Sequence, residues 1–274
     1  MAPLRKRKIR FEIDDQPIAT IKKTKRNGQF RARLLVKEAD LLQGESGRGG
    51  FELSARDRES SFLAGTLPIR MIPAEGHSII SDIDDTIKFS NVENRAELLA
   101  NTFARPFVPI EGMAAVYREL ANNGVEFHYV TASPWQLFEP LNAFIGEFGY
   151  PDGSMHFRTF RISDHLLKRV GVIHRGGKAE AVRRILSSFP ERKFTLIGDS
   201  GEKDVEIYAR CYQQFPDRVE RVLIRLIRPE HRFSESIIEG QLLLPPSVFK
   251  VFETSEELAQ ILDVSSGSSL AGSP

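Results

Sequence analysis

Apolar and polar residues alternate with period two along the first quarter of the chain, from Lys8 to about Ile72. Such alternation puts every second side chain on one face of a strand, so it predicts short antiparallel strands joined by hairpins. An Asn27-Gly28 turn and a glycine-rich loop from Gly44 to Gly50 would separate these strands. We therefore expect a small antiparallel β-sandwich-like domain over residues 1–73. The alternating apolar positions are Ile9, Phe11, Ile13, Phe30, Ala32, Leu34, Val36, Phe51, Leu53, Leu67, Ile69 and Met71.

Beyond Pro73 the pattern changes to short apolar runs that alternate with segments of helical spacing. This order is typical of a parallel sheet covered by helices on both faces. The expected fold class is therefore α/β, a Rossmann-like three-layer parallel sheet over residues 74–264. We interpret residues 150–175 as an irregular basic insertion with a strand near 157–162, and residues 265–274 as a disordered tail. Strands are expected at 78–81, 125–130, 194–197 and 222–227, and helices before Asn123, Gly149 and Pro190.

The composition is that of a globular protein. The chain has 274 residues, of which 41% are apolar, enough for the core of one large and one small domain. No run approaches the roughly 20 apolar residues that a membrane-spanning helix needs, and the N-terminus is too basic for a secretory signal. The single cysteine, Cys211, cannot form an internal disulfide and is expected to be a buried, inert thiol. We expect a cytoplasmic protein.

Positive charge is concentrated near the N-terminus, although the net charge of the chain is only +1. Residues 1–37 contain 12 Lys and Arg residues against 3 Asp and Glu residues. This basic head could attract an anionic membrane, so that the protein associates with it peripherally, or it could be a solvated face. We do not expect a nucleic-acid partner, because aromatic residues do not interleave with these charges as a stacking platform requires.

Three carboxylates stand close together at the end of an apolar run, at Asp82, Asp84 and Asp85, and Thr86 follows them. Like charges this close repel one another unless a cation neutralises them. Asp-x-Asp-x-Thr after a buried strand is typical of phosphoryl-transfer enzymes that hold magnesium beside an aspartate nucleophile. The pattern therefore predicts hydrolysis of a phosphate ester. A solvated turn is the alternative, since Asp and Thr are common after strands.

A second acidic cluster follows another apolar run far downstream, where Asp199 comes first and Asp204 five residues later. The carboxyl ends of parallel strands meet at one edge of a sheet, which is where ligands bind. We therefore expect the two clusters to converge, so that Asp82 and Asp199 share one metal ion.

Together these motifs resemble one known family. The runs DIDDTIK, FHYVTASPWQL, a Gly-Gly-Lys helix start and GDSGEKD-x-EIY are similar, in order and spacing, to the phosphatidate phosphatases named for an actin-patch-associated yeast member. That family lies within the haloacid-dehalogenase-like superfamily, and the resemblance covers about residues 73–230. It implies a Mg²⁺-dependent phosphatidate phosphatase that converts a lipid phosphate monoester to diacylglycerol and inorganic phosphate through an aspartyl-phosphate. The implied partner is thus a phospholipid substrate.

The resemblance also implies roles for charged residues. Asp82 would be the nucleophile, and Asp84 would protonate the leaving alkoxide and then activate water. Mg²⁺ would take oxygen atoms from Asp82, the main-chain carbonyl of Asp84, and Asp199. Lys178 would offset the negative charge of the phosphoaspartate. Asp204 would ligate the metal through water, hold Lys178 or cap the following helix.

Three hydroxyl side chains are candidates for contact with the substrate. Thr131 closes the strand at 125–130, where it can donate a hydrogen bond to phosphoryl oxygens. Ser133 competes for this role, or caps the helix that Pro134 opens. Thr86 is a further candidate, with capping of its turn or orientation of Asp84 as the alternatives.

Apolar residues stand near both motifs. Trp135 and Phe138 follow Thr131, and Phe103, Phe107 and Val108 follow the nucleophile. A core position is the plain interpretation of each of them alone. If several are exposed at the rim of the site, they could admit acyl chains.

Two alternatives to a lipid phosphatase remain open. A phosphomonoesterase acting on a soluble small-molecule phosphate would use the same machinery, because that machinery does not encode the leaving group. A catalytically silent phospholipid-sensing module would keep the fold without turnover. Such a module has no need for a general acid two positions after a nucleophile, which speaks against it.

Overall fold

The computed structural model of the protein divides into two compact units, Met1–Pro73 and Ala74–Pro274. None of the described helices is long and apolar enough to cross a membrane. The tail expected at 265–274 lies outside the described residues. These are 6–13, 16–21, 23–24, 30, 34, 36, 50–60, 63–90, 106–158, 177–227 and 244–264.

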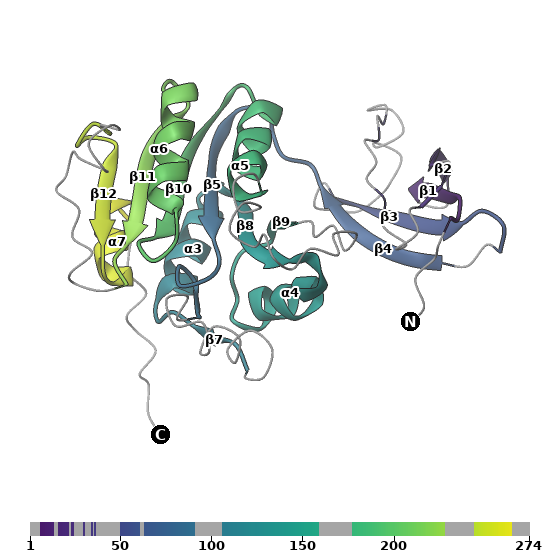
Figure 1. Ribbon diagram of the computed structural model, residues 1–274, viewed down its shortest axis with the longest axis horizontal. Coiled ribbons are helices and arrows are strands. Elements are labelled where there is room, and N and C mark those ends of the chain that lie inside the picture. Colours follow the sequence, from purple (N-terminus) through teal and green to yellow (C-terminus); the bar gives the residue numbers. More distant parts are fainter. Residues whose placement is uncertain are drawn as a thin grey trace, which may run out of the picture. The chain divides into compact units, whose positions relative to one another are not determined.

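The described part of the N-terminal unit forms a four-stranded antiparallel sheet in the order β2-β1-β3-β4 (Figure 1). The alternating pattern predicts three of these strands, and Ile9, Phe11 and Ile13 of β1 are buried as expected. It misses β2, whose sequence QPIATI includes a proline. The strand expected at 30–36 is not confirmed, because Phe30, Leu34 and Val36 lie outside the four strands. The strands are β1 (Ile9–Ile13), β2 (Gln16–Ile21), β3 (Gly50–Asp57) and β4 (Leu63–Arg70).

The C-terminal unit is built on a six-stranded parallel sheet in the order β12-β11-β10-β5-β8-β9. This confirms the predicted α/β class, and all four predicted strands are present. A short antiparallel pair, β6 (Lys88–Phe89) and β7 (Val108–Pro109), follows β5. The strands of the large sheet are β5 (Gly76–Asp82), β8 (Glu126–Pro134), β9 (Gly153–Arg158), β10 (Arg192–Asp199), β11 (Val219–Arg225) and β12 (Phe249–Phe252).

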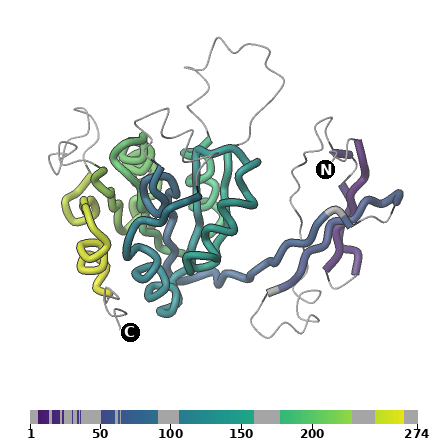
Figure 2. Tube along the Cα trace, turned by 90° about the horizontal axis from the view of Figure 1, so that it is seen from below, coloured from purple at the N-terminus to yellow at the C-terminus, as the bar shows by residue number. Residues whose placement is uncertain are grey.

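Helices cover both faces of this sheet, which makes three layers. On one face Ile79 of β5 packs in a core with α3, α4 and α7, and on the other face Ile80 packs with α5 and α6. Figure 2 shows α6 on one side of the strands and α3 and α7 on the other. The helices are α3 (Met113–Asn122), α4 (Phe138–Glu147), α5 (Gly177–Ser188), α6 (Asp204–Gln214) and α7 (Ser255–Ile261), with a 3₁₀ turn η1 (Trp135–Leu137) before α4.

One strand of the C-terminal unit differs from the sequence-based expectation. Residues 153–158 form the edge strand β9, which pairs in parallel with β8. This strand begins four residues before the one expected near 157–162, and residues 159–162 lie outside the described residues. Its sequence GSMHFR alternates from Ser154 onwards, a short signal that the surrounding polar residues hide. Pro140 lies in the first turn of α4, directly after η1, where a missing N–H group costs nothing. Cys211 is buried as predicted, and burial raises the pKa of its thiol to about 11.

Two glycines give a matched test of how closely β9 packs against β8. A Cβ atom on Gly153 would lie 2.6 Å from the carbonyl oxygen of Phe127, whereas one on Gly146 of α4 would meet nothing within 4 Å. We expect Gly153→Ala to lower the free energy of unfolding by about 1–3 kcal/mol through overpacking. Gly146→Ala should raise it by about 0.5–1 kcal/mol, since alanine favours a helix interior. Urea unfolding of both variants would measure this, and equal effects would contradict the close approach of β9 to β8.

Candidate active site

Two acidic strand ends lie side by side where the order of strands reverses. From β5 the chain continues to β8 on one side of it, and later returns as β10 on the other side. Ser81 of β5 pairs with Ile197 of β10, so Asp82 and Asp199 end neighbouring parallel strands. Oxygen atoms of Asp82, Asp199 and Glu202 all lie within 4.8 Å of one another. The two acidic clusters therefore converge at the carboxyl edge of the sheet.

Lys178 stands among these carboxylates, in the first turn of α5. Its Nζ atom lies 2.6 Å from Oδ1 of Asp82 and 3.2 Å from Oε2 of Glu202, and it also contacts Oδ1 of Asp204. Only 9% of Lys178 is exposed. The ammonium group thus bridges the end of β5 and the loop after β10.

Both carboxylate oxygens of Asp204 have partners. Its Oδ1 atom contacts Lys178, and its Oδ2 atom accepts a hydrogen bond from the backbone N–H of Asp199 at 3.2 Å. Lys203, not Asp204, occupies the N-cap position of α6. Of the three roles considered for Asp204, the structure shows the contact with Lys178. Glu202 joins Asp82 and Asp199 in the acidic group.

Burial and mutual repulsion dominate the electrostatics of this cluster. Burial raises the pKa of Asp82 well above its usual range, and the attraction of Lys178 does not offset it. Burial and the neighbouring Asp204 likewise raise the pKa of Asp199. Burial alone would lower the pKa of Lys178, but Asp204, Asp82 and Glu202 raise it well above its usual range. Four carboxylates around one ammonium group leave an excess of negative charge.

This excess fits a divalent cation. The Oδ2 atom of Asp199 is buried and has no hydrogen-bond partner among the described residues, although Oδ1 accepts bonds from the N–H groups of Gly201 and Glu202. A buried carboxylate oxygen without a donor is costly unless a cation binds it. Asp82, Asp199 and Glu202 offer the oxygen ligands that Mg²⁺ prefers. These three residues could therefore hold the ion, with Asp204 supporting them through Lys178.

Asp84 lies in a separate network, in which each of its carboxylate oxygens has two partners. Its Oδ1 atom lies 2.8 Å from Nζ of Lys88 and accepts a hydrogen bond from Ser90 at 2.6 Å. Its Oδ2 atom accepts bonds from the hydroxyl groups of Thr131 and Ser133, both at 3.1 Å. Burial would raise the pKa of Asp84, but Lys88 and these hydrogen bonds lower it.

Two of the hydroxyl side chains, Ser133 and Thr86, differ from one of the alternatives considered for them. Ser133 does not cap the following turn, since Pro134 holds that position. Thr86 is fully buried and donates to Oδ2 of Asp82 at 3.4 Å, so it faces the expected nucleophile and not Asp84. Asp85 adopts a left-handed backbone (φ 54°) and accepts a bond from the N–H of Ser90, which makes it a turn residue.

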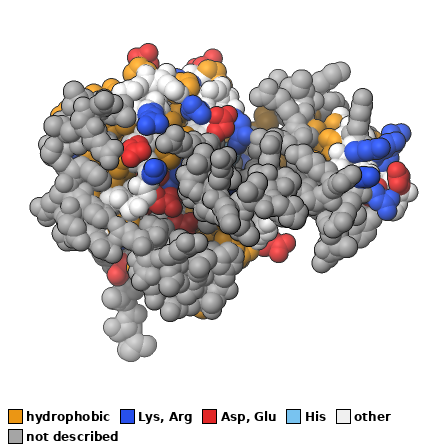
Figure 3. All heavy atoms as spheres, viewed as in Figure 1, with side chains coloured by type: hydrophobic (Ala, Val, Ile, Leu, Met, Phe, Trp, Pro, Cys, Tyr) orange, Lys and Arg blue, Asp and Glu red, His pale blue; other side chains and the backbone are white. Residues whose placement is uncertain are grey.

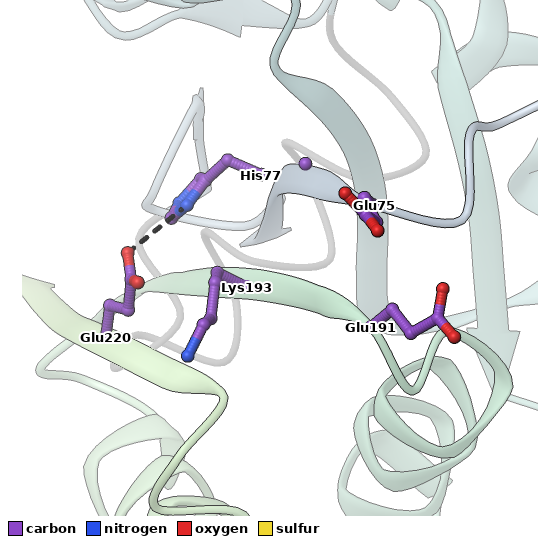
Figure 4. Close-up of a pocket in the computed structure, with 6 residues that line it drawn as sticks. Glu75, His77, Glu191, Lys193 and Glu220 are labelled. Atoms are coloured by element: carbon purple, nitrogen blue, oxygen red, sulfur yellow. Dashed lines mark ion pairs between the residues drawn. The ribbon is translucent and has the colours of Figure 1, made fainter.

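A shallow hollow at the opposite edge of the sheet is distinct from this site. Glu75, His77, Glu191, Lys193 and Glu220 line it, next to the amino ends of β5, β10 and β11 (Figure 4). His77 lies 3.4 Å from Glu220 across it. Because the acidic cluster is at the carboxyl ends of the same strands, the hollow takes no part in that chemistry.

Sequence reasoning assigned no role to Glu202, Lys88 or Ser90. Glu202 lies inside the GDSGEKD run, where three acidic residues share one loop and nothing in the pattern ranks them. Lys88 and Ser90 follow the DIDDT run directly, but only a tight turn brings them back to Asp84.

Removing one charge from the cluster should relieve its repulsion. We expect Asp199→Asn to raise the free energy of unfolding of the metal-free protein by about 1 kcal/mol, which is ~2–4 °C in Tm. Mg²⁺ should raise the Tm of the native protein and leave that of the variant unchanged. Thermal unfolding in EDTA and in MgCl₂ measures both effects, with Asp152→Asn, an exposed site before β9, as the control. An equal response of all three proteins to Mg²⁺ would contradict the assignment.

Comparison with known proteins yields a family match over most of the C-terminal unit. Residues 77–226 match the family described as phosphatidate phosphatase APP1, catalytic domain. Phosphatidate phosphatase APP1 of Saccharomyces cerevisiae is 32% identical over 167 residues, which are 60% of this chain and 28% of that protein. An uncharacterized protein of Schizosaccharomyces pombe is 33% identical over 207 residues, 74% of this chain and 31% of that protein.

The chain thus spans about three tenths of the length of these two curated relatives. Among solved structures, an uncharacterized protein from Listeria monocytogenes serotype 4b aligns with a TM-score of 0.41 and 12% identity. That alignment covers 69% of this chain and 99% of the other. Since the family match at residues 77–226 spans more than half of the chain, the protein belongs to the family of the phosphatidate phosphatase APP1 catalytic domain.

Proposed function

We propose that this protein is a Mg²⁺-dependent phosphatidate phosphatase that works through an aspartyl-phosphate. The observation that carries the proposal is the buried group of Asp82, Asp199 and Glu202 with Lys178 in ion-pair contact, at the carboxyl edge of a parallel sheet. Membership of the family supports the phosphatidate substrate. The ion, when bound, supplies positive charge that stabilises the anionic phosphoryl group.

Two transfers complete the reaction. In the first, an oxygen atom of Asp82 attacks phosphorus, the bond from phosphorus to the lipid oxygen breaks, and Asp84 gives its proton to the departing oxygen. That proton enters with the substrate, as a monoprotonated phosphate ester. In the second, Asp84 takes a proton from water, whose oxygen attacks the phosphorus as the bond from phosphorus to Asp82 breaks. Inorganic phosphate then leaves and carries the proton of Asp84 with it. Lys178 stays beside Asp82 throughout and balances its charge.

Exposed apolar side chains near the site favour a lipid over a small soluble ester. Phe89 and Val108 face one another across β6 and β7, and the residues on either side of Phe89 both contact Asp84. The adjacent Phe107 packs on Phe144 of α4. Phe138 begins that helix, and Trp135 lies in the turn η1 just before it. Phe103 lies outside the described residues. The exposed fractions run from 37% to 54% for Phe138, Trp135, Phe89 and Val108.

The basic head offers less unpaired positive charge for contact with a lipid surface than its composition suggests. Figure 3 shows basic side chains gathered on the N-terminal unit. Within its described residues, Arg7 pairs with Glu59 at 2.9 Å, and Arg10 and Arg56 pair with Glu12 at 2.6 and 2.7 Å. These pairs offset part of the positive charge. We therefore assign the contact with a lipid surface first to the apolar side chains around the site, with peripheral membrane association as its consequence.

A pair of substrates with the same phosphorylated head tests the proposal against its rivals. We expect release of inorganic phosphate from short-chain phosphatidate in micelles, and release at least about 10-fold slower from glycerol 3-phosphate, because the acyl chains add binding energy. Comparable rates on both would identify a phosphomonoesterase for soluble esters. Binding of phosphatidate with no release from either would identify a lipid-sensing module.

The role of Asp82 as nucleophile is tested by replacing it with asparagine, which has nearly the same shape. We expect Asp82→Asn to lower kcat at least about a thousandfold, because an amide cannot form the acyl phosphate. Circular dichroism and the Tm should show a folded protein. Asp152→Asn serves as the control and should keep full activity. Unimpaired turnover in the Asp82→Asn protein would assign the attack on phosphorus to another group.

A further inference from the structure

Lys88 is buried beside the carboxylate that the proposed mechanism uses for proton transfer. It is 1% exposed, and its Nζ atom lies 2.8 Å from Oδ1 of Asp84. The same nitrogen donates a hydrogen bond to Oγ of Ser90, and Ser90 in turn donates to the same Oδ1 atom. The ring of Phe107 lies beneath the ammonium group, 4.9 Å from Nζ to its centroid. A buried lysine is costly, so this arrangement points to a specific task.

The backbone fixes Lys88 in this position before any ligand arrives. The N–H groups of Ile87 and Lys88 both donate to the carbonyl oxygen of Ile83 at 3.0 Å, and the N–H of Asp85 donates to the carbonyl oxygen of Lys88 at 2.7 Å. Lys88 also pairs with Pro109 in the hairpin of β6 and β7. The turn thus returns directly on Asp84, and the contact between the two side chains costs little further ordering.

The two oxygen atoms of Asp84 have unlike partners. Oδ1 faces the ammonium group of Lys88 and the hydroxyl of Ser90, inside the protein. Among the described residues, Oδ2 accepts hydrogen bonds from the neutral hydroxyl groups of Thr131 and Ser133, at the end of β8. A hydrogen bond from an ammonium group to a carboxylate is stronger than one from a neutral hydroxyl group. The contact of Oδ1 with Lys88 should therefore persist when the contacts of Oδ2 are exchanged.

We propose that Lys88, together with Ser90, is a positioning residue that holds Oδ1 of Asp84 throughout the cycle, so that Oδ2 exchanges the proton with the leaving oxygen and with water. This inference rests on the proposed function. In the first transfer the proton on Oδ2 passes to the lipid oxygen as its bond to phosphorus breaks, and in the second Oδ2 takes a proton from the attacking water. The hydroxyl groups of Thr131 and Ser133, released from Oδ2, then donate to the phosphoryl oxygens.

The test separates proton transfer from binding and from folding. An alkoxide leaving group needs a proton, whereas nitrophenolate leaves without one. For Lys88→Met, which keeps the length and removes the charge, we expect the single-turnover release of diacylglycerol from short-chain phosphatidate to slow about 100-fold or more. The single-turnover release of nitrophenolate from p-nitrophenyl phosphate should slow less than about fivefold, because this step precedes the attack of water. For Ser90→Ala, the loss of rate on phosphatidate should exceed the loss on p-nitrophenyl phosphate by about tenfold.

Lys193→Met is the matched control, because Lys193 is exposed at the opposite edge of the sheet, and both rates should stay those of the native protein. Equal losses on the two esters, or no loss, would overturn the inference and leave Lys88 a structural residue. If Lys88→Met does not fold, the Ser90→Ala ratio decides in the same way. Failure of the native protein to hydrolyse either ester would overturn the proposed function, and this inference with it.

Discussion

Repulsion among buried carboxylates is the constraint on which the C-terminal unit depends. Asp82 and Asp199 end neighbouring strands, Glu202 and Asp204 belong to the following loop and helix, and Lys178 is the ammonium group among them. A fold selected for stability alone would avoid such a cluster, because each buried charge loses its hydration. Its position at the switch point of a parallel sheet, where ligands bind, explains its presence through function.

The site separates into two parts with opposite electrostatics. Around Asp82, acidic groups outnumber the single lysine, burial raises the carboxyl pKa, and the excess charge favours a cation. Around Asp84, every carboxylate oxygen is satisfied and the pKa is lowered. In the proposed mechanism these two aspartates, two positions apart in sequence, meet different demands. The first attacks phosphorus, and the second transfers protons.

Much of this could be predicted from the sequence, because it follows from strand patterns and topology. The apolar runs before Asp82 and Asp199 predict parallel strands, and parallel strands bring their carboxyl ends to one edge. The contacts of Glu202 and Lys88 could not be predicted, since they depend on how two loops turn back on themselves. The same holds for Asp204, whose residue type fits ligation, lysine support or capping. We expected a strand near 157–162, whereas β9 runs from Gly153 to Arg158, because its alternation spans too few residues to fix the bounds.

The central claim is that Asp82, Asp199 and Glu202 hold one divalent cation, and anomalous diffraction from crystals grown with Mn²⁺ in place of Mg²⁺ tests it most directly. The account predicts one strong anomalous peak within bonding distance of carboxylate oxygens of Asp82 and Asp199, at the carboxyl edge of the sheet. A peak confined to the hollow lined by Glu75, Glu191 and Glu220, or the absence of any peak beside Asp82, would contradict it.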